Sequence, residues 1–284
     1  MERRVDLRSG HTVWIDSERQ TRPNLPSSAC PFCPGGLEAP DDYEVRWFEN
    51  RWPSLPDGRS EVLLFCPEHG GSLAELGADR IRRVVDLWAD RTQCQGARDD
   101  VAYVLVFENR GAEVGATIEH PHGQLYALPD VPPAALAELR TDSCPICSEL
   151  SRGHEVSRTG GWRACVPDAA TWPYELLLAP EAHLPDLVAL DDTSRDDLAA
   201  VLGDALGRLD RLFDAPMPYM LWVHQRPTDG EVWPLAHVHI EVAPLFRRAG
   251  VQRFVAAGEL GSGVYFNPLL PEEAAEELRA LGTA

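Results

Sequence analysis

The 284-residue sequence contains no lysine, and arginine supplies all 26 of its basic residues. Because the chain carries 45 acidic residues, its formal net charge at pH 7 is −19. A nucleic-acid backbone or an anionic membrane requires a broad positive surface, so this charge argues against both partners. A single phosphorylated metabolite needs only a few local arginines and remains compatible with the composition.

Long hydrophobic runs are also missing. The longest, at 103–107 and 175–180, are far shorter than the roughly 20 residues that cross a bilayer. The first ten residues lack the apolar segment of a signal peptide. We therefore expect a cytoplasmic, globular protein with no membrane partner, and its 44% hydrophobic residues are enough to form a core.

The seven cysteines are an odd number and do not suggest a disulfide framework. Four of them form two Cys-x-x-Cys pairs, "CPFC" (Cys30, Cys33) and "CPIC" (Cys144, Cys147). In a chain without a secretion signal, such pairs more often bind metal than form disulfides.

A set of landmarks occurs twice in the same order. The gap from the second cysteine of each pair to the next histidine is 69 − 33 = 36 residues in one half and 183 − 147 = 36 in the other. A His-x-His pair then follows after 120 − 69 = 51 and 237 − 183 = 54 residues. The landmarks are Cys33, His69 and His120, then Cys147, His183 and His237.

The segments between these landmarks predict the same elements in each half. A helical pattern at 78–91 is followed by a strand at 101–109, and another at 191–213 by a strand at 218–225. We expect an α+β fold with two histidine-triad-like repeats, an antiparallel sheet that the copies can share, and flanking helices. The predicted repeats are 1–135, with the catalytic segment, and 136–284, with a C-terminal tail. Short helices are expected in the alanine-rich linker near 133–140 and in the tail at 270–282.

Each half supplies the ligands of a tetrahedral zinc site, which needs two thiolates on a tight turn and two imidazoles. For the second half two alternatives stay open. One is a relic cluster that binds no metal, and the other is a set that draws on Glu138, His224 and His239. The two predicted zinc sets are Cys30, Cys33, His69 and His120, and Cys144, Cys147, His183 and His237.

The segment "EHPHGQLY" spaces His120, His122 and Gln124 by two residues, which predicts one strand face. His120 can then bind the metal while His122 meets a substrate. An imidazole can attack phosphorus when its other nitrogen donates to a carbonyl that fixes the tautomer. We expect Gly123 to leave room for a phosphate. The alternative is a pair of core histidines beside a metal.

Gln124 indicates which reaction follows. An amide donates a hydrogen bond to a phosphate oxygen but supplies no proton at neutral pH, so it favours transfer between phosphorylated partners over hydrolysis. The second copy, "HVHIE", has Glu241 at the matching position. Only the first repeat is therefore expected to be catalytic.

The segments "FENRGAEVGATIEHPHGQ", "WPYELLLAPEAH" and "HVHIEV" resemble the galactose-1-phosphate uridylyltransferase family, a duplicated branch of the histidine-triad superfamily. The likeness covers nearly the whole chain. It implies that His122 takes a uridylyl group from UDP-glucose and passes it to galactose 1-phosphate, in a homodimer. It also implies zinc at the first cluster and, in some members, an iron-type site at Glu138, His224, His237 and His239. Besides Gln124, the implied substrate-binding residues are Arg19, Arg22, Asn50, Asn109, Thr117, Arg253, Phe254 and Glu259.

Some positions leave the specificity open. Arg51 and Gly258 replace residues that help to hold nucleotide and sugar in some members of that family. The alternatives are a uridylyltransferase for another sugar 1-phosphate and a dinucleoside polyphosphate phosphorylase, against which Glu259 in the sugar-contacting tail argues. A non-catalytic zinc scaffold would predict decay of the His-Pro-His-Gly-Gln pattern in both halves, and only the second half lacks it.

Overall fold

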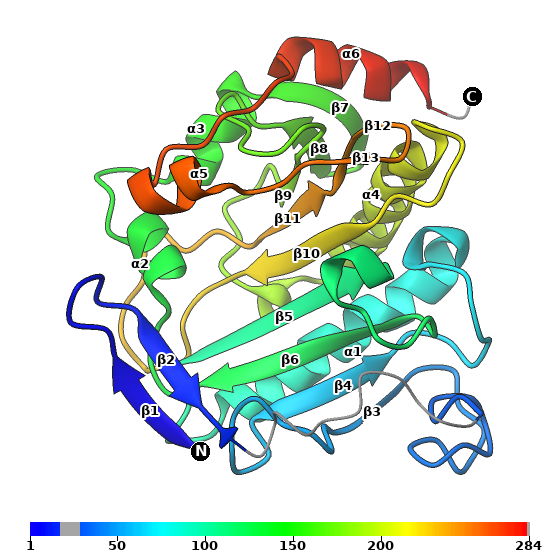
Figure 1. The fold of residues 1–284 in the computed structure, drawn as a ribbon, viewed down its shortest axis with the longest axis vertical. Helices are drawn as coiled ribbons and strands as arrows, with labels where there is room; N and C mark the ends of the chain where they lie inside the picture. The colour runs from blue at the N-terminus through cyan, green and yellow to red at the C-terminus, as the bar shows by residue number, and fades with distance from the viewer. Residues whose placement is uncertain (18–28, 283–284) are drawn as a thin grey trace.

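The structure is a computed structural model that describes residues 1–17 and 29–282. A nine-stranded antiparallel sheet forms its centre (Figure 1). In chain order its strands are β3 (Arg46–Glu49), β4 (Ser60–Leu64), β5 (Tyr103–Arg110), β6 (His122–Leu128), β7 (His154–Thr159), β8 (Trp162–Val166), β9 (Leu176–Pro180), β10 (Tyr219–His224) and β11 (His239–Pro244). Across the sheet they follow the order β3-β4-β6-β5-β10-β11-β9-β8-β7.

The sheet contains the same strand–helix–strand order twice. Helix α1 (Ala78–Gly96) lies between β4 and β5 in the chain, and helix α4 (Asp192–Arg211) lies between β9 and β10. Strands β5 and β10 pair with each other and so join the two repeats at the middle of the sheet. The predicted α+β class, with two repeats that share one antiparallel sheet and carry flanking helices, is confirmed. The boundary at 135/136 stays a prediction, and it falls inside helix α2 (Pro133–Leu139).

Helix α1 packs on the sheet because of its apolar spacing. Ile81, Val84, Val85 and Trp88 recur at intervals of three and four residues, which places them on one helix face. All four side chains are fully buried. The sequence pattern thus decides which side of this helix faces the strands.

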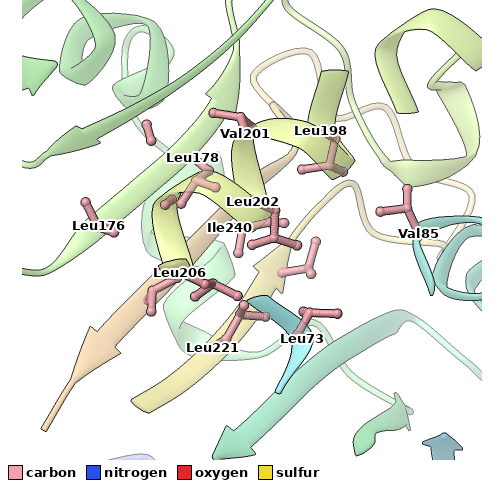
Figure 2. Close-up of a cluster of buried hydrophobic side chains, with 14 of the residues drawn as sticks. Leu73, Val85, Leu176, Leu178, Leu198, Val201, Leu202, Leu206, Leu221 and Ile240 are labelled. Carbon is pink, nitrogen blue, oxygen red and sulfur yellow. The ribbon is translucent and has the colours of Figure 1, made fainter. Parts of the chain in front are cut away.

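Helix α4 covers the second repeat and reaches the first. Its N-terminus is capped by Asp191, whose carboxylate accepts a hydrogen bond from the Ser194 amide at 2.8 Å. In Figure 2, Leu202 and Leu206 of α4 lie over Leu221 of β10. The same core contains Leu176 and Leu178 of β9, Ile240 of β11, Val85 of α1, and Leu63, Val104, Val106 and Leu125 of the first repeat. One hydrophobic core therefore lies under both repeats.

Shorter elements surround the sheet. The predicted linker helix and tail helix are observed as α2 and as α6 (Pro271–Ala280). No helix within the described residues is long and apolar enough to cross a membrane. The remaining elements are β1 (Glu2–Val5), β2 (Thr12–Ile15), η2 (Leu73–Glu75), η3 (Ala112–Val114), α3 (Pro145–Arg152), η4 (Leu187–Ala189), β12 (Phe246–Arg248), β13 (Val251–Gln252) and α5 (Ala257–Ser262).

Candidate active site and metal clusters

The first predicted zinc set forms one compact cluster. Cys30, Cys33, His69 and His120 each offer a ligand atom, and these atoms lie within 4.8 Å of one another. The Nδ1 atom of His120 is 3.9 Å from Cys30 Sγ and 3.8 Å from Cys33 Sγ. Tetrahedral zinc with metal–ligand bonds of about 2.0–2.3 Å separates its ligand atoms by roughly 3.3–3.8 Å, so this donor set fits the metal after small side-chain shifts.

The other ring nitrogen of His120 is held by groups outside the cluster. Its Nε2 atom lies 2.7 Å from the carbonyl oxygen of Cys66 and 2.9 Å from the hydroxyl oxygen of Tyr43. Burial lowers the pKa of His120, which favours the neutral ring. With the proton on Nε2, the lone pair of Nδ1 faces the two thiols, as metal binding requires.

His122 begins β6 on the side of the sheet opposite the helices. Its Nδ1 atom lies 2.7 Å from the backbone oxygen of His120 and donates to it, so the lone pair of this ring is on Nε2. The ring of Phe32, from the Cys-x-x-Cys turn, contacts the ring of His122 edge-on at a centroid distance of 5.2 Å. His122 is therefore oriented from two sides, by a backbone carbonyl and by an aromatic ring.

The predicted alternation holds along β6. His122, Gln124 and Tyr126 share the half-exposed face, while Leu125 and Ala127 point into the core. His120 lies at a bend two residues before the strand and is buried at the metal cluster. The spacing of two residues thus places His120 in the buried metal cluster and His122 on the half-exposed face of β6.

The predicted reason for Gly123 is wrong. A Cβ atom at this position would come within 2.8 Å of Cζ of Phe65 and 2.9 Å of the carbonyl oxygen of Phe107. The glycine therefore allows close packing on the helix-covered side of the sheet, and not the approach of a phosphate on the other side.

Two of the predicted substrate-binding residues lie near the His122–Gln124 face of β6. The amide of Asn50, after β3, is 3.5 Å from Oε1 of Gln124. Asn109 is on β5, two residues after Phe107, which pairs with Gln124 in the sheet. Thr117 is half-buried in the loop that leads to His120. Arg19 and Arg22 lie outside the described residues.

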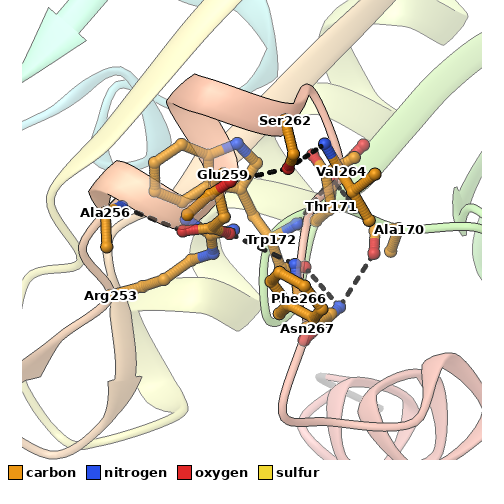
Figure 3. Close-up of polar contacts among 12 residues, drawn as sticks. Ala170, Thr171, Trp172, Arg253, Ala256, Glu259, Ser262, Val264, Phe266 and Asn267 are labelled. Carbon is orange, nitrogen blue, oxygen red and sulfur yellow. Dashed lines mark hydrogen bonds and ion pairs between the residues drawn. The ribbon is translucent and has the colours of Figure 1, made fainter.

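Arg253 and Glu259, which the resemblance assigns to the sugar, belong to a separate group that contacts Trp172 of the second repeat (Figure 3). Arg253 Nη2 and Glu259 Oε1 are 2.5 Å apart, and both side chains are buried. The guanidinium of Arg253 stacks on Trp172 at 4.5 Å. Glu259 also accepts a hydrogen bond from the amide of Ala256 at 3.0 Å. Phe254, by contrast, is 74% exposed.

The second predicted zinc set is also assembled. Nδ1 of His237 lies 3.5 Å from Cys144 Sγ and 3.4 Å from Cys147 Sγ, and Nδ1 of His183 lies 3.5 Å from Cys147 Sγ. Nε2 of His237 is 2.9 Å from the carbonyl oxygen of Pro180. This arrangement copies that of His120 and Cys66, and its donors fit zinc in the same way.

A third cluster stands where the second repeat would have its own active site. Glu138, His224, His239 and Glu241 offer ligand atoms within 4.8 Å of one another. In the sheet His224 pairs with His239, the counterpart of His122. His224 Nδ1 is 2.7 Å from Glu138 Oε1. The two alternatives for this half thus coexist, because His237 faces the thiols while His239 faces the carboxylates.

The third cluster also shows what sequence reasoning missed. The sequence indicates Glu241 only as the replacement for Gln124, whereas the structure brings it within reach of His224 and His239. Its one signal is the alternation that places it on the same strand face as His239. Tyr43 gives no signal in the sequence, since a single tyrosine in a loop matches no motif.

The nine-stranded sheet, with a His-x-His-x-Gln strand beside a Cys₂His₂ cluster in one repeat, defines the chain as a two-repeat α+β protein with a reactive imidazole on a strand. Sequence models of the galactose-1-phosphate uridyl transferase N-terminal and C-terminal domains match residues 49–132 and 137–284. The galactose-1-phosphate uridylyltransferase of Thermotoga maritima is 35% identical over 98% of each chain. The chain belongs to the galactose-1-phosphate uridylyltransferase family, and it is a transferase.

Solved structures agree with this assignment. A structure described as uridylyltransferase matches with a TM-score of 0.90 and 29% identity, covering 99% of this chain and 98% of the other. An ADP-glucose phosphorylase from Arabidopsis thaliana with bound ADP-glucose matches with a TM-score of 0.80 and 26% identity, over 98% and 97% of the two chains.

Proposed function

We propose that the chain exchanges a uridylyl group between UDP-glucose and galactose 1-phosphate through a covalent uridylyl-His122. The observation that carries this proposal is the 2.7 Å hydrogen bond from Nδ1 of His122 to the backbone oxygen of His120. It leaves the nucleophilic lone pair on Nε2 and stabilises the positive charge that the ring gains on attack. The names of the relatives support uridylyl transfer as the reaction.

In the first step, Nε2 of His122 attacks the α-phosphorus of UDP-glucose. A phosphorus–nitrogen bond forms, the bond from phosphorus to the bridging oxygen breaks, and glucose 1-phosphate leaves with the electron pair. This leaving group needs no proton, because phosphate is a stable anion at neutral pH. The amide N–H of Gln124 donates a hydrogen bond to a non-bridging oxygen of the phosphoryl group. The neighbouring Asn50 helps to orient this amide, because its own N–H donates to Oε1 of Gln124.

In the second step, a phosphate oxygen of galactose 1-phosphate attacks the same phosphorus. The phosphorus–nitrogen bond breaks, UDP-galactose leaves, and the electron pair returns to Nε2 of His122. Neither step transfers a proton to solvent, so an amide at 124 is sufficient where hydrolysis would need an acid.

We assign zinc to both thiolate clusters. At the first, Cys30, Cys33, His69 and His120 would hold the ion, which supplies structural organisation there. The role of these residues is to hold the backbone oxygen of His120 beneath His122. At the second, Cys144, Cys147, His183 and His237 would tie α3 to the loop after β9 and to the loop before β11.

Further expectations belong to the same proposal. Asn109, Thr117, Arg19 and Arg22 are assigned to the nucleotide and phosphates, and Arg253, Phe254 and Glu259 to the hexose. A homodimer is consistent with the exposed apolar side chains of the C-terminal segment, Phe254, Leu260, Val264 and Phe266. The cytoplasmic location stays a prediction.

A second candidate is a phosphorylase, in which inorganic phosphate takes the nucleotidyl group. The Arabidopsis ADP-glucose phosphorylase, 28% identical over 93% of this chain, keeps this candidate in the test. The greater similarity to uridylyltransferases favours transfer to a sugar 1-phosphate.

The test is to incubate the protein with UDP-glucose labelled in the α-phosphate and to look for an acid-labile label on the chain. We expect the label to form without acceptor, to be absent in His122→Ala, and to persist in the exposed control His11→Ala. Galactose 1-phosphate should then release it as UDP-galactose. Label on His122→Ala would overturn the proposal, and faster release by inorganic phosphate would favour the phosphorylase.

A further inference from the structure

Tyr43 connects the two parts of the first cluster, although no sequence pattern points to it. It lies in the loop before β3, and its half-buried ring packs with the small core of Phe32, Ala39, Val62 and Leu64. Its hydroxyl donates to the backbone oxygen of Phe32 at 2.7 Å. The hydroxyl oxygen of Tyr43 itself lies 2.9 Å from Nε2 of His120.

We propose that Tyr43 is a positioning residue that holds the Cys30–Cys33 turn against His120 and thereby orients His122. The effect on the metal ligands stands on geometry alone, while the effect on His122 rests on the proposed function. Tyr43 would touch neither metal nor substrate.

A count of hydrogens supports this assignment. The phenol has one hydrogen, which goes to the oxygen of Phe32, so its lone pairs face His120. Nε2 of His120 has one hydrogen, which is shared between the oxygens of Cys66 and Tyr43 at 2.7 and 2.9 Å. This bond turns Nδ1 of His120 toward the two thiols. Such outer partners orient metal-binding histidines and raise their basicity.

Two paths lead from Tyr43 to His122. On one, Tyr43 holds the backbone of Phe32, whose ring contacts the ring of His122 at 5.2 Å. On the other, Tyr43 holds the ring of His120, whose backbone oxygen accepts from Nδ1 of His122 at 2.7 Å. The ring of His122 is therefore held by Phe32 and, at Nδ1, by His120, and both of these residues bond to the hydroxyl of Tyr43.

The second repeat provides an internal comparison. There, Nε2 of His237 faces the backbone oxygen of Pro180 at 2.9 Å, and within the described part of the chain no tyrosine hydroxyl bonds to it. In that repeat the imidazole that corresponds to His122, the ring of His239, is buried. Within the described residues, the additional hydroxyl is thus found at the histidine that precedes the half-buried His122, and not at the one that precedes the buried His239.

The experiment removes the hydroxyl with Tyr43→Phe and measures zinc release to the chromogenic chelator 4-(2-pyridylazo)resorcinol, without substrate. We expect the first cluster to release zinc roughly 10–100-fold faster, because outer partners contribute about that factor to metal affinity. The second cluster should release zinc at the wild-type rate. The kinetic phase of zinc release that is lost in Cys147→Ser identifies this cluster. In turnover we expect kcat to fall about tenfold with KM for UDP-glucose within about twofold.

Tyr174→Phe is the matched control, because it removes the phenol hydroxyl of a buried tyrosine that donates to Glu277 at 2.8 Å, away from both thiolate clusters. It should leave both zinc phases and kcat unchanged. If Tyr43→Phe behaves like this control, or only lowers the melting temperature, the proposal is overturned. Faster zinc release in a protein without uridylyl transfer would retain the role of Tyr43 at the cluster and reject the proposed function instead.

Discussion

The two repeats present an imidazole in the same way and surround it with different groups. Nδ1 of His122 lies 2.7 Å from the oxygen of His120, and Nδ1 of His239 lies 2.8 Å from the oxygen of His237. The far nitrogen of His239, however, lies 3.5 Å from Glu138, and this ring is buried. His122 is half-buried beside a glutamine.

This difference separates what the backbone provides from what the neighbours provide. The His-x-His geometry fixes the tautomer in both repeats, because a backbone oxygen accepts from Nδ1 in each. Burial acts to lower the pKa of His239, but Glu241 and Glu138 outweigh it and raise that pKa. Because His239 is buried and its carboxylate neighbours favour the protonated ring, this imidazole is unsuited to nucleophilic attack, although its backbone contact matches that of His122.

The largest effect is expected from replacing a cysteine of the first thiolate cluster, and the matching replacement in the second cluster should have a much smaller one. Cys33→Ser should remove zinc from the first cluster and lower the transfer rate by about 10³-fold or more, because His120 loses its anchor. Cys147→Ser should lower thermal stability and change the rate by less than about tenfold. Zinc content and kcat measure both effects, with the exposed Cys94→Ser as control. Equal loss of activity in the two ligand variants would contradict the division of tasks.

A smaller effect is expected from exchanging the residues that distinguish the two strands. Gln124→Glu places a negative charge beside the phosphoryl group and removes an N–H donor, so kcat should fall about 10²–10³-fold. The reciprocal Glu241→Gln should leave kcat within about twofold. Comparable losses from both variants would show that the third cluster contributes to turnover.

The shared core can be tested with Leu202→Ala. This fully buried leucine of α4 should cost about 2–5 kcal/mol of the free energy of unfolding. Because one core underlies both repeats, denaturant unfolding should remain a single transition. The partly exposed Val188→Ala should cost less than about 0.5 kcal/mol. Two separate transitions would mean that the repeats unfold independently.

The smallest effect concerns the seam between the repeats, where Glu108 of β5 accepts a hydrogen bond from Tyr219 of β10 at 2.9 Å. Burial raises the pKa of Glu108 from 4.5 to about 7. Since the folded protein then binds more protons than the unfolded chain between these values, stability falls as the pH rises from 4.5 to about 7. The loss amounts to about 3 kcal/mol at most.

Glu108→Gln should remove this part of the pH dependence, whereas Glu113→Gln, at an exposed position, should retain it. Urea unfolding at several pH values measures the slope. An unchanged slope in Glu108→Gln would show that this carboxyl keeps an ordinary pKa.

Much of the candidate site could be predicted because its residues repeat at fixed spacing. The gap of 36 residues from cysteine to histidine identified both thiolate clusters, and alternation along β6 placed His122 and Gln124 on one face. Repeated spacing does not extend to the partners of these histidines. Glu138, 86 residues from His224, could be named only within one alternative set, and Tyr43, 77 residues from His120, could not be predicted at all.

By itself, the sequence determined the duplicated order of elements, the ligands of the two thiolate clusters and the strand that carries His122, since these follow from local periodicity and covalent spacing. Only the tertiary structure decided that the repeats join through β5 and β10, that Gly123 serves the core, and that carboxylates gather around His239. Those features depend on which distant side chains meet when the core is packed, and no short stretch of sequence contains that information.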